Sequence, residues 1–191
     1  MDDKGRIIYQ TVYESPVGAL TLTASEDALT ALSFPQERYP EYVERLTKER
    51  EVCIPAADKI PRILRETREW LDIYFSGKRP DFTPALAPQG SDFRKVVWEE
   101  LLKIPYGCTI TYGQIAKQVA DRKGILRMSA QAVGGAVGHN PIGIIIPCHR
   151  VVGTGGNLTG FGGGIRTKEA LLKLEGMDMG RFYIPKKGTA L

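Results

Sequence analysis

The segment from Thr111 to Gly138, TYGQIAKQVADRKGILRMSAQAVGGAVG, decides the fold of the C-terminal half of this chain. Thr111 and Gln114 have the spacing of a capping box, which predicts a short helix over residues 112–120. Ser129 is the expected N-cap of a second helix, and the basic turn DRKGILR joins the two. Two short helices joined by such a turn indicate a helix-turn-helix.

The second helix of this segment is built almost entirely from small residues. Glycines stand in its interior, where each destabilises a helix by about 0.5–1 kcal/mol relative to alanine. Two explanations remain open: the helix packs tightly against another helix, or its smooth face enters a narrow groove of nucleic acid. The residues concerned are Ala130, Ala132, Val133, Gly134, Gly135, Ala136, Val137 and Gly138.

Further helices are expected on both sides of this segment. Ser91 can cap a helix that ends before Pro105, and the amphipathic run RTKEALLKLEG ends at Gly176. Upstream, residues 78–90, KRPDFTPALAPQG, contain three prolines and mark a domain boundary. Residues 89–191 are therefore predicted to form a mainly helical domain that contains the helix-turn-helix.

Residues 1–88 have a different pattern. The runs IIYQTVYES (7–15) and ALTLTASEDALTALSF (19–34) are rich in β-prone residues, and a Pro-Val-Gly turn separates them. They predict a small antiparallel sheet. The spacing of apolar residues over 61–75 predicts a helix that covers the sheet, and 41–51 can form a further short helix. The predicted fold class is α+β.

The composition excludes several classes of protein. The chain has 191 residues, of which 42% are hydrophobic, as in an ordinary globular protein. Three cysteines cannot build a disulfide framework, and two histidines leave too few donors for a zinc site, so we expect no metal or other cofactor. No apolar run approaches the ~18 residues of a membrane span, and the N-terminal residues do not resemble a signal peptide. We expect a cytoplasmic protein with no membrane partner.

Charge is divided unevenly along the chain. Residues 1–90 contain 12 basic and 15 acidic side chains, whereas residues 91–191 contain 14 basic and 7 acidic ones. A basic half is compatible with a polyanionic partner, although a solvated surface would give the same count. The candidate phosphate contacts are Arg94, Lys117, Arg122, Lys123, Lys168, Lys186 and Lys187.

The run IIIPCHRVV (144–152) carries the clearest chemical signal. Cys148 is followed by His149 and Arg150, whose positive potential favours the nucleophilic thiolate. Neighbouring side chains on an extended strand point to opposite faces, so His149 can act on Cys148 only through a local bend or a bridging water. Cys53 and Cys108 lack such neighbours.

These residues carry a family resemblance. The motif PCHRV (147–151), preceded by GHNP and followed by a glycine-rich loop and a helix that ends in EG, resembles the O6-alkylguanine-DNA alkyltransferases, also called methylated-DNA–protein-cysteine methyltransferases. The resemblance extends from Ser91 to Gly176. It implies DNA repair in which an alkyl group passes irreversibly, in a single turnover, from O6 of guanine, or O4 of thymine, to Cys148.

The resemblance also implies roles for other residues. His149 would be a base linked to Cys148 through water, and Glu175 would orient it. Tyr112 would donate a proton to the leaving guanine and help to rotate the nucleotide. Asn140 would be the hinge between the recognition helix and the active-site strand.

A DNA interface and a substrate pocket follow from the same resemblance. The helix 130–138 would enter the minor groove of double-stranded DNA, with Gln131 where the family has an arginine, and the protein would act as a monomer. The implied DNA contacts are Ala130, Gln131, Ala132, Gly134, Gly135 and Arg150. The implied pocket residues are Val151, Phe161, Gly162 and Gly163, with Phe161 in place of a tyrosine and Gly162 in place of a serine.

Two other functions fit the sequence less well. The chain could be a non-catalytic protein of the same fold that binds or reports alkyl damage, although the presence of Cys148 argues against this. It could also be a thiol hydrolase that uses Cys148 and His149 and needs no DNA.

Overall fold

The computed structural model describes residues 7–36 and 38–185. The first half is built on a four-stranded sheet with the order β3-β2-β1-β4. The strands are β1 (Ile7–Ser15), β2 (Gly18–Ala24), β3 (Leu29–Ser33) and β4 (Glu51–Cys53). Lys186 and Lys187, two of the candidate phosphate contacts, lie outside the described residues.

The sheet is mixed rather than purely antiparallel. The pairs β1–β2 and β2–β3 are antiparallel as predicted, but β4 pairs with β1 in parallel. The reason is the helix α1 (Glu41–Glu49), which returns the chain across the sheet so that β4 runs in the same direction as β3 and β1. A three-residue strand after a charged helix has too little alternation to be recognised from sequence.

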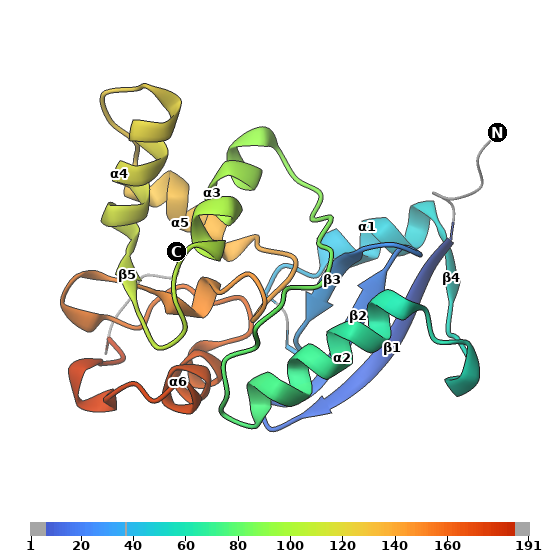
Figure 1. Cartoon of the computed structure of the whole chain (residues 1–191). Helices are drawn as coiled ribbons and strands as arrows, with labels where there is room; N and C mark the ends of the chain where they lie inside the picture. The colour runs from blue at the N-terminus through green and yellow to red at the C-terminus, as the bar shows by residue number, and fades with distance from the viewer. Residues whose placement is uncertain (1–6, 37, 186–191) are drawn as a thin grey trace.

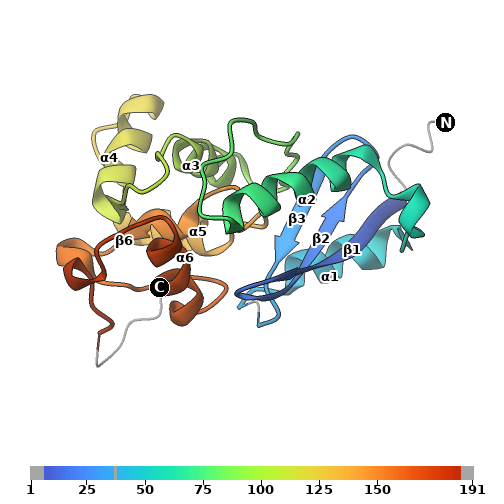
Figure 2. The same ribbon diagram turned by 60° about the horizontal axis from the view of Figure 1, so that its bottom comes forward.

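Two helices cover this sheet, one on each face (Figures 1 and 2). Helix α2 (Arg62–Phe75) is the predicted covering helix, and it buries Ile63, Leu64 and Leu71 against the strands. Helix α1 lies on the opposite face and buries Leu46. Short 3-10 turns are found at Ala57–Lys59, Cys148–Arg150, Thr154–Gly156 and Met179–Arg181.

The second half is mainly helical, as predicted. Helix α3 (Asp92–Leu102) packs against α4 (Tyr112–Lys123) and α5 (Ala130–Gly138), and α6 (Ile165–Leu174) lies nearer the C-terminus. Two short strands, β5 (Ile110–Thr111) and β6 (Val151–Val152), pair in parallel. The α+β class is confirmed.

Local sequence signals set the ends of the helix-turn-helix. Thr111 and Gln114 form both halves of the predicted capping box at the start of α4. Ser129 accepts a hydrogen bond from the N–H of Ala132 at the start of α5. Gly124 ends α4 in the left-handed conformation, with φ of 64°. These caps fix the turn between the two helices on both sides.

One hydrophobic core spans both halves of the molecule. The segment that leads to the cysteine is hydrogen-bonded to the edge strand β3. The N–H of Leu32 donates to Pro141 O (2.9 Å), and the N–H of Gly143 donates to Leu32 O (3.2 Å). A Cβ atom at Gly143 would lie 2.6 Å from the ring of Phe34, so only glycine fits there. The N-terminal sheet therefore positions the segment that contains Cys148.

Candidate active site around Cys148

The segment that leads to Cys148 is a series of tight turns, not the active-site strand that the sequence predicted. The N–H of Ile145 donates to Gly143 O (2.8 Å), and the N–H of Cys148 donates to Ile146 O (2.8 Å). Ile144 has φ of 68°, a left-handed conformation that is strained for a β-branched residue. The 3-10 turn Cys148–Arg150 follows and supplies the local bend that the sequence required between Cys148 and His149.

Asn140 fixes both the turns and the sulfur. Its Nδ2 group donates to Ile146 O (2.8 Å), to Cys148 Sγ (3.1 Å) and, at 3.3 Å, to Ile142 O. Its Oδ1 accepts from the N–H of Ile142 (3.1 Å). An N–H directed at sulfur stabilises a thiolate more than a thiol. Asn140 thus acts on Cys148 directly, beyond the hinge role that the resemblance implied.

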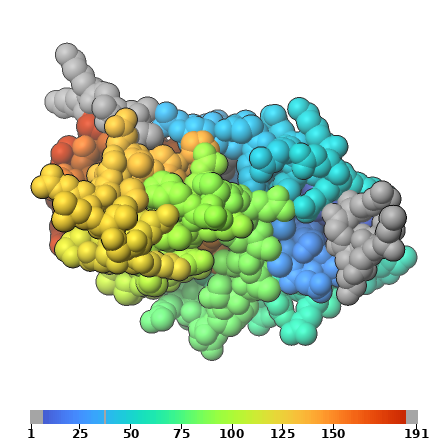
Figure 3. Space-filling model, turned by 90° about the horizontal axis from the view of Figure 1, so that it is seen from above, coloured from blue at the N-terminus to red at the C-terminus, as the bar shows by residue number. Residues whose placement is uncertain are grey.

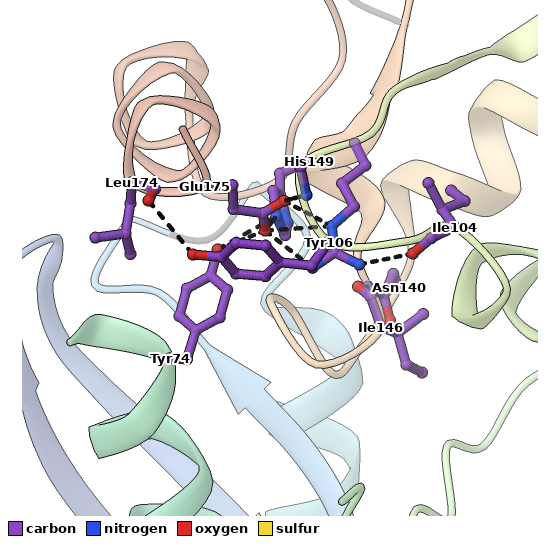
Figure 4. A network of polar contacts seen from close by, with 10 residues as sticks. Tyr74, Ile104, Tyr106, Asn140, Ile146, His149, Leu174 and Glu175 are labelled. Carbon is purple, nitrogen blue, oxygen red and sulfur yellow. Dashed lines mark hydrogen bonds and ion pairs between the residues drawn. The ribbon is translucent and has the colours of Figure 1, made fainter. Parts of the chain in front are cut away.

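His149 is completely buried and is held by Glu175 (Figure 4). Its Nε2 lies 2.6 Å from Glu175 Oε1. A carboxylate can only accept a hydrogen bond, so Nε2 carries the proton and Nδ1 keeps its lone pair. Among the described residues, Nδ1 has no hydrogen-bond partner. The imidazole is therefore arranged as a base with one nitrogen available.

Electrostatics keep this pair as carboxylate and neutral imidazole. Burial by itself would raise the pKa of Glu175, but hydrogen bonds from His149 and Arg150, together with the charge of Arg150, lower it to about 2. The pKa of His149 is lowered because the ring is buried and because Arg150 and Lys168 are positive, which outweighs the opposite effect of Glu175. His149 can therefore accept a proton at neutral pH.

Arg150, which the resemblance implied to be a DNA contact, is held by partners inside the protein. Its side chain is 10% exposed, and its Nε donates to Glu175 Oε2 (2.9 Å) while Nη1 donates to Ile104 O (2.7 Å). Its guanidinium neutralises the buried carboxylate of Glu175, and its role as a DNA contact stays a prediction.

Sequence reasoning also missed Tyr74 as a partner of Glu175. The Tyr74 hydroxyl, on α2, donates to Glu175 Oε1 (2.9 Å) and lies 3.3 Å from His149 Nε2. Burial is the main cause that raises the pKa of Tyr74, so it remains a donor. The only signal in the sequence was its place on the apolar face of α2, which is also expected of a core aromatic.

Lys168 is the other buried cation of the site. It was a candidate phosphate contact, but its side chain is fully buried, and Nζ donates to Val151 O (2.6 Å) and to Thr159 O (2.8 Å). Burial lowers its pKa to about 8, although the nearby Cys148 acts in the opposite sense. Lys168 therefore ties the strand after Cys148 to the glycine-rich loop.

Tyr112 is hydrogen-bonded to the same glycine-rich loop. Its hydroxyl donates to Thr159 O (3.0 Å) and Gly160 O (3.2 Å). Its pKa is raised by burial and by the charge of Cys148. In this structure the hydroxyl is therefore a protonated donor that is bonded to the backbone of the loop.

The predicted pocket residues lie on one loop and the adjoining strand. Phe161 is buried between Phe34 and His149, with ring centroids 5.3 Å and 6.4 Å away. Gly163 must be glycine, since a Cβ atom would lie 2.6 Å from the Phe34 ring. Gly162 O accepts from the N–H of Arg38 (3.0 Å), and Val151 is buried. The N-terminal half thus helps to shape the loop.

Helix α5 has one buried and one exposed face. Gly134 lies on the buried face, as tight packing would require, but a Cβ atom at Gly135 would meet nothing within 4 Å. The small size of Gly135 is therefore not required by internal packing. The exposed residues on this helix are Ala130, Gln131, Ala132 and Gly135.

Two of the remaining basic candidates are already paired. Arg122 contacts Glu99 and Glu100, and Lys117 lies 2.7 Å from Asp121. Among residues 7–36 and 38–185, no group of three or more His, Cys, Asp or Glu side chains could hold a metal ion. Within the same ranges, no helix is long and apolar enough to span a bilayer.

The fold and the site together define a class of protein: a two-part α+β protein whose helix-turn-helix half holds a buried cysteine next to a carboxylate-bound histidine. Residues 8–88 match the family domain described as "6-O-methylguanine DNA methyltransferase, ribonuclease-like domain", and residues 92–177 match its "DNA binding domain". The chain belongs to the 6-O-methylguanine DNA methyltransferase family, which confirms the resemblance recognised in the sequence.

Two relatives and one solved structure align with most of this chain. A methylated-DNA–protein-cysteine methyltransferase of Methanosarcina acetivorans is 40% identical over 170 residues, which are 88% of this chain and 99% of the relative. One of Mycobacterium bovis is 42% identical, over 88% of this chain and 92% of its own. The crystal structure of Mycobacterium tuberculosis OGT in complex with DNA has a TM-score of 0.70 and 38% identity, over 92% of this chain and 94% of that chain.

The Glu175 network predicts a pH-dependent stability. Glu175→Gln should lower the free energy of unfolding at pH 7 by about 3–5 kcal/mol, because Arg150 is left as a buried charge without its counter-charge. A carboxyl whose folded pKa is lowered stabilises the protein above its unfolded pKa of about 4.3, and this stability disappears as the pH falls through the folded value. The difference between wild type and variant should therefore shrink from about pH 4.3 towards about pH 2.

Urea unfolding at a series of pH values measures this effect. Glu169→Gln is the matched control, since Glu169 pairs with the exposed Arg166 and should change stability by no more than about 0.5 kcal/mol. A Glu175→Gln effect that is as small as the control, or that does not vary with pH, would contradict the assigned network.

Asn140 predicts the reactivity of the sulfur. Asn140→Ala removes the N–H donor to Cys148, and a hydrogen bond to a charged group contributes about 1.5–3 kcal/mol, so alkylation of Cys148 by iodoacetamide at pH 7 should slow roughly tenfold to a hundredfold. Peptide mass mapping measures each thiol separately, and the exposed Cys108 serves as the internal reference. Equal rates at Cys148 in both proteins would show that the donor is irrelevant.

Proposed function

We propose that this protein repairs DNA by transferring an alkyl group from O6 of guanine, or O4 of thymine, to Cys148, and that each molecule reacts once. The observation that carries the proposal is the placement of Cys148 Sγ under the Asn140 N–H, next to a neutral His149 that Glu175 orients. Membership of the methyltransferase family, with cysteine methyltransferases among the relatives, supports the same reaction.

The proposed chemistry follows from these groups. His149, through a water molecule, takes the proton of the Cys148 thiol at its free Nδ1. The thiolate then attacks the alkyl carbon, an S–C bond forms, and the bond between that carbon and O6 breaks. The electron pair leaves with the guanine, which takes up a proton. The thioether that results has no route back to a thiol in this site, so the reaction is stoichiometric.

Tyr112 is the proposed hydrogen-bond donor to the leaving base. Its raised pKa keeps the phenol protonated. To donate, the hydroxyl must exchange its contacts with Thr159 O and Gly160 O for a contact with the base. In the proposed reaction, the hydroxyl makes this exchange when the base enters between Tyr112 and Phe161.

Duplex DNA is the proposed partner, bound in its minor groove by the exposed face of α5. Cys148 is only 6% exposed, so a base can reach it only after leaving the helical stack. The open space over Gly135 favours the groove explanation for the small residues of α5. We propose that a monomer acts in this way, in the cytoplasm, where its free cysteines stay reduced.

The test of the proposal is a methyl-transfer assay. The protein is incubated with a duplex that contains O6-methylguanine, and its intact mass is measured. One methyl group per molecule on Cys148, and none in Cys148→Ala, is expected. Binding without transfer would favour a non-catalytic damage-binding protein, and DNA-independent turnover of esters or amides would favour a thiol hydrolase; either result would contradict the proposal.

A bulky substitution at Gly135 should change stability and DNA binding in opposite directions. Gly135→Leu should stabilise the folded protein by about 0.5–1 kcal/mol, because leucine is the better helix former and nothing obstructs its Cβ. The same change should weaken binding to duplex DNA at least tenfold, because the bulk prevents close approach of α5 to the groove. Thermal unfolding and fluorescence anisotropy measure the two effects.

Ala170→Leu is the control for added bulk, since Ala170 is exposed on α6 rather than α5. It should leave DNA affinity unchanged. If Gly135→Leu binds duplex as tightly as wild type, α5 is not the DNA-facing helix.

A further inference from the structure

The turn between α4 and α5, residues 124–128, presents an unusual side chain. Leu126 is 96% exposed, the highest value for a large apolar residue in the described chain, and its neighbour Ile125 is 43% exposed. Single exposed apolar residues are common on protein surfaces, so exposure alone decides nothing. The position and surroundings of Leu126 are more informative.

The turn is held at both ends, so it presents Leu126 in a defined direction. On one side, the N–H of Gly124 donates to Asp121 O (3.2 Å) and the N–H of Ile125 donates to Ala120 O (3.0 Å). On the other side, Met128 packs against the hydrophobic core and Ser129 caps α5. The turn that carries Leu126 follows the C-terminal end of α4, which is the end farther from α6 (Figure 1).

Leu126 belongs to the same surface as the exposed face of α5. It lies three residues before the N-cap Ser129, a span of at most about 10 Å. Seen from above Figure 1, the yellow and gold residues of this region form one end of the molecule, away from the blue strands (Figure 3). A duplex that rests on the start of α5 must therefore pass within reach of Leu126.

The charge around the turn favours a polyanion. Arg127 follows Leu126 directly and has no ion-pair partner among the described residues, and Lys123 lies 5.9 Å from the Phe93 ring centroid rather than beside a carboxylate. The sequence contains no Asp or Glu from Arg122 to Lys168. An apolar tip with adjacent cations is the chemistry with which minor-groove proteins wedge base steps apart.

We propose that Leu126 is an apolar wedge that enters the minor groove beside the target nucleotide, while Arg127 contacts the phosphate backbone. This rests on the proposed function, since the wedge serves to unstack the base that Cys148 then receives. Successive bases on one strand are about 3.4 Å apart. Because Leu126 lies within about 10 Å of Ser129, the wedge acts within about three base steps of the base that contacts the start of α5. Leu126 is a positioning residue, because it acts on the DNA and not on the reacting atoms.

The experiment compares Leu126→Ser with wild type on two substrates. Methyl transfer to Cys148 is timed with O6-methylguanine in a duplex and in the same strand alone. We expect the variant to be at least tenfold slower on the duplex and less than twofold slower on the single strand, which needs no unstacking against a partner strand. Ile54→Ser is the matched control, because Ile54 is an exposed apolar residue in the other half. Unchanged thermal midpoints verify folding.

A second readout does not depend on methyl transfer. Cys148→Ser, alone and combined with Leu126→Ser, is added to a duplex that carries 2-aminopurine next to the lesion, and the rise in fluorescence reports unstacking. A rise with Cys148→Ser that is lost with the double variant supports the wedge. An equal rise, equal duplex rates, or equal slowing on both substrates overturns it.

The outcomes also separate this proposal from the proposed function. If wild type methylates Cys148 on the duplex and Leu126→Ser does so equally fast, only the wedge fails. If wild type transfers no methyl group to Cys148 on either substrate, the proposed function fails, and the fluorescence readout still decides the wedge. If Leu126→Ser instead converts a dimer to a monomer in sedimentation and leaves the duplex rate unchanged, the turn contacts a second copy and the wedge is rejected.

Discussion

The buried carboxylate of Glu175 is the constraint on which the rest of this structure depends. A carboxylate can remain ionised inside a protein only when charges and hydrogen bonds replace the water it has lost. Here four partners come from three separate segments: His149 and Arg150 after the cysteine, Tyr74 on α2, and the backbone N–H of Gly107. The end of α6 is thereby joined to both halves of the molecule.

This arrangement links the stability of the fold to the chemistry of the site. The contact that compensates Glu175 also sets the tautomer of His149, since a carboxylate at Nε2 leaves Nδ1 as the base. Arg150 keeps the carboxylate ionised and at the same time lowers the pKa of His149, so the imidazole remains neutral. The imidazole of His149, which is the proposed proton acceptor for Cys148, is thus held in place by interactions that also stabilise the fold.

Sequence reasoning succeeded where the signal is local. The capping box of Thr111 and Gln114, the N-cap Ser129 and the C-terminal glycine of α4 act within a few residues, and all lie where their chemistry predicts. It failed where a role depends on a distant partner. Nothing near Arg150 in the sequence reveals that it faces Glu175, and Lys168 was a candidate phosphate contact although its Nζ donates to backbone oxygens inside the protein.

The strand β4 and Tyr74 show the same limit. A three-residue strand is defined by its neighbour β1, which lies more than forty residues earlier in the chain, and a tyrosine on an apolar helix face gives no sign that its hydroxyl meets Glu175. The strained turn at Ile144 was equally hidden, because an Ile-rich run predicts a strand unless the packing that overrides it is known. Tertiary contacts therefore decide which polar residues of this chain are functional.

The N-terminal half carries none of the proposed reacting groups, yet it contacts the site at several points. Its edge strand β3 bonds the chain at Pro141 and Gly143, and the Phe34 ring fits only because Gly143 and Gly163 lack side chains. Tyr74 on α2 then completes the shell around Glu175. A nucleophile that must act on an unstacked base needs side chains whose positions are fixed by packing and hydrogen bonds. The contacts of β3, Phe34 and Tyr74 supply part of that support from the N-terminal half.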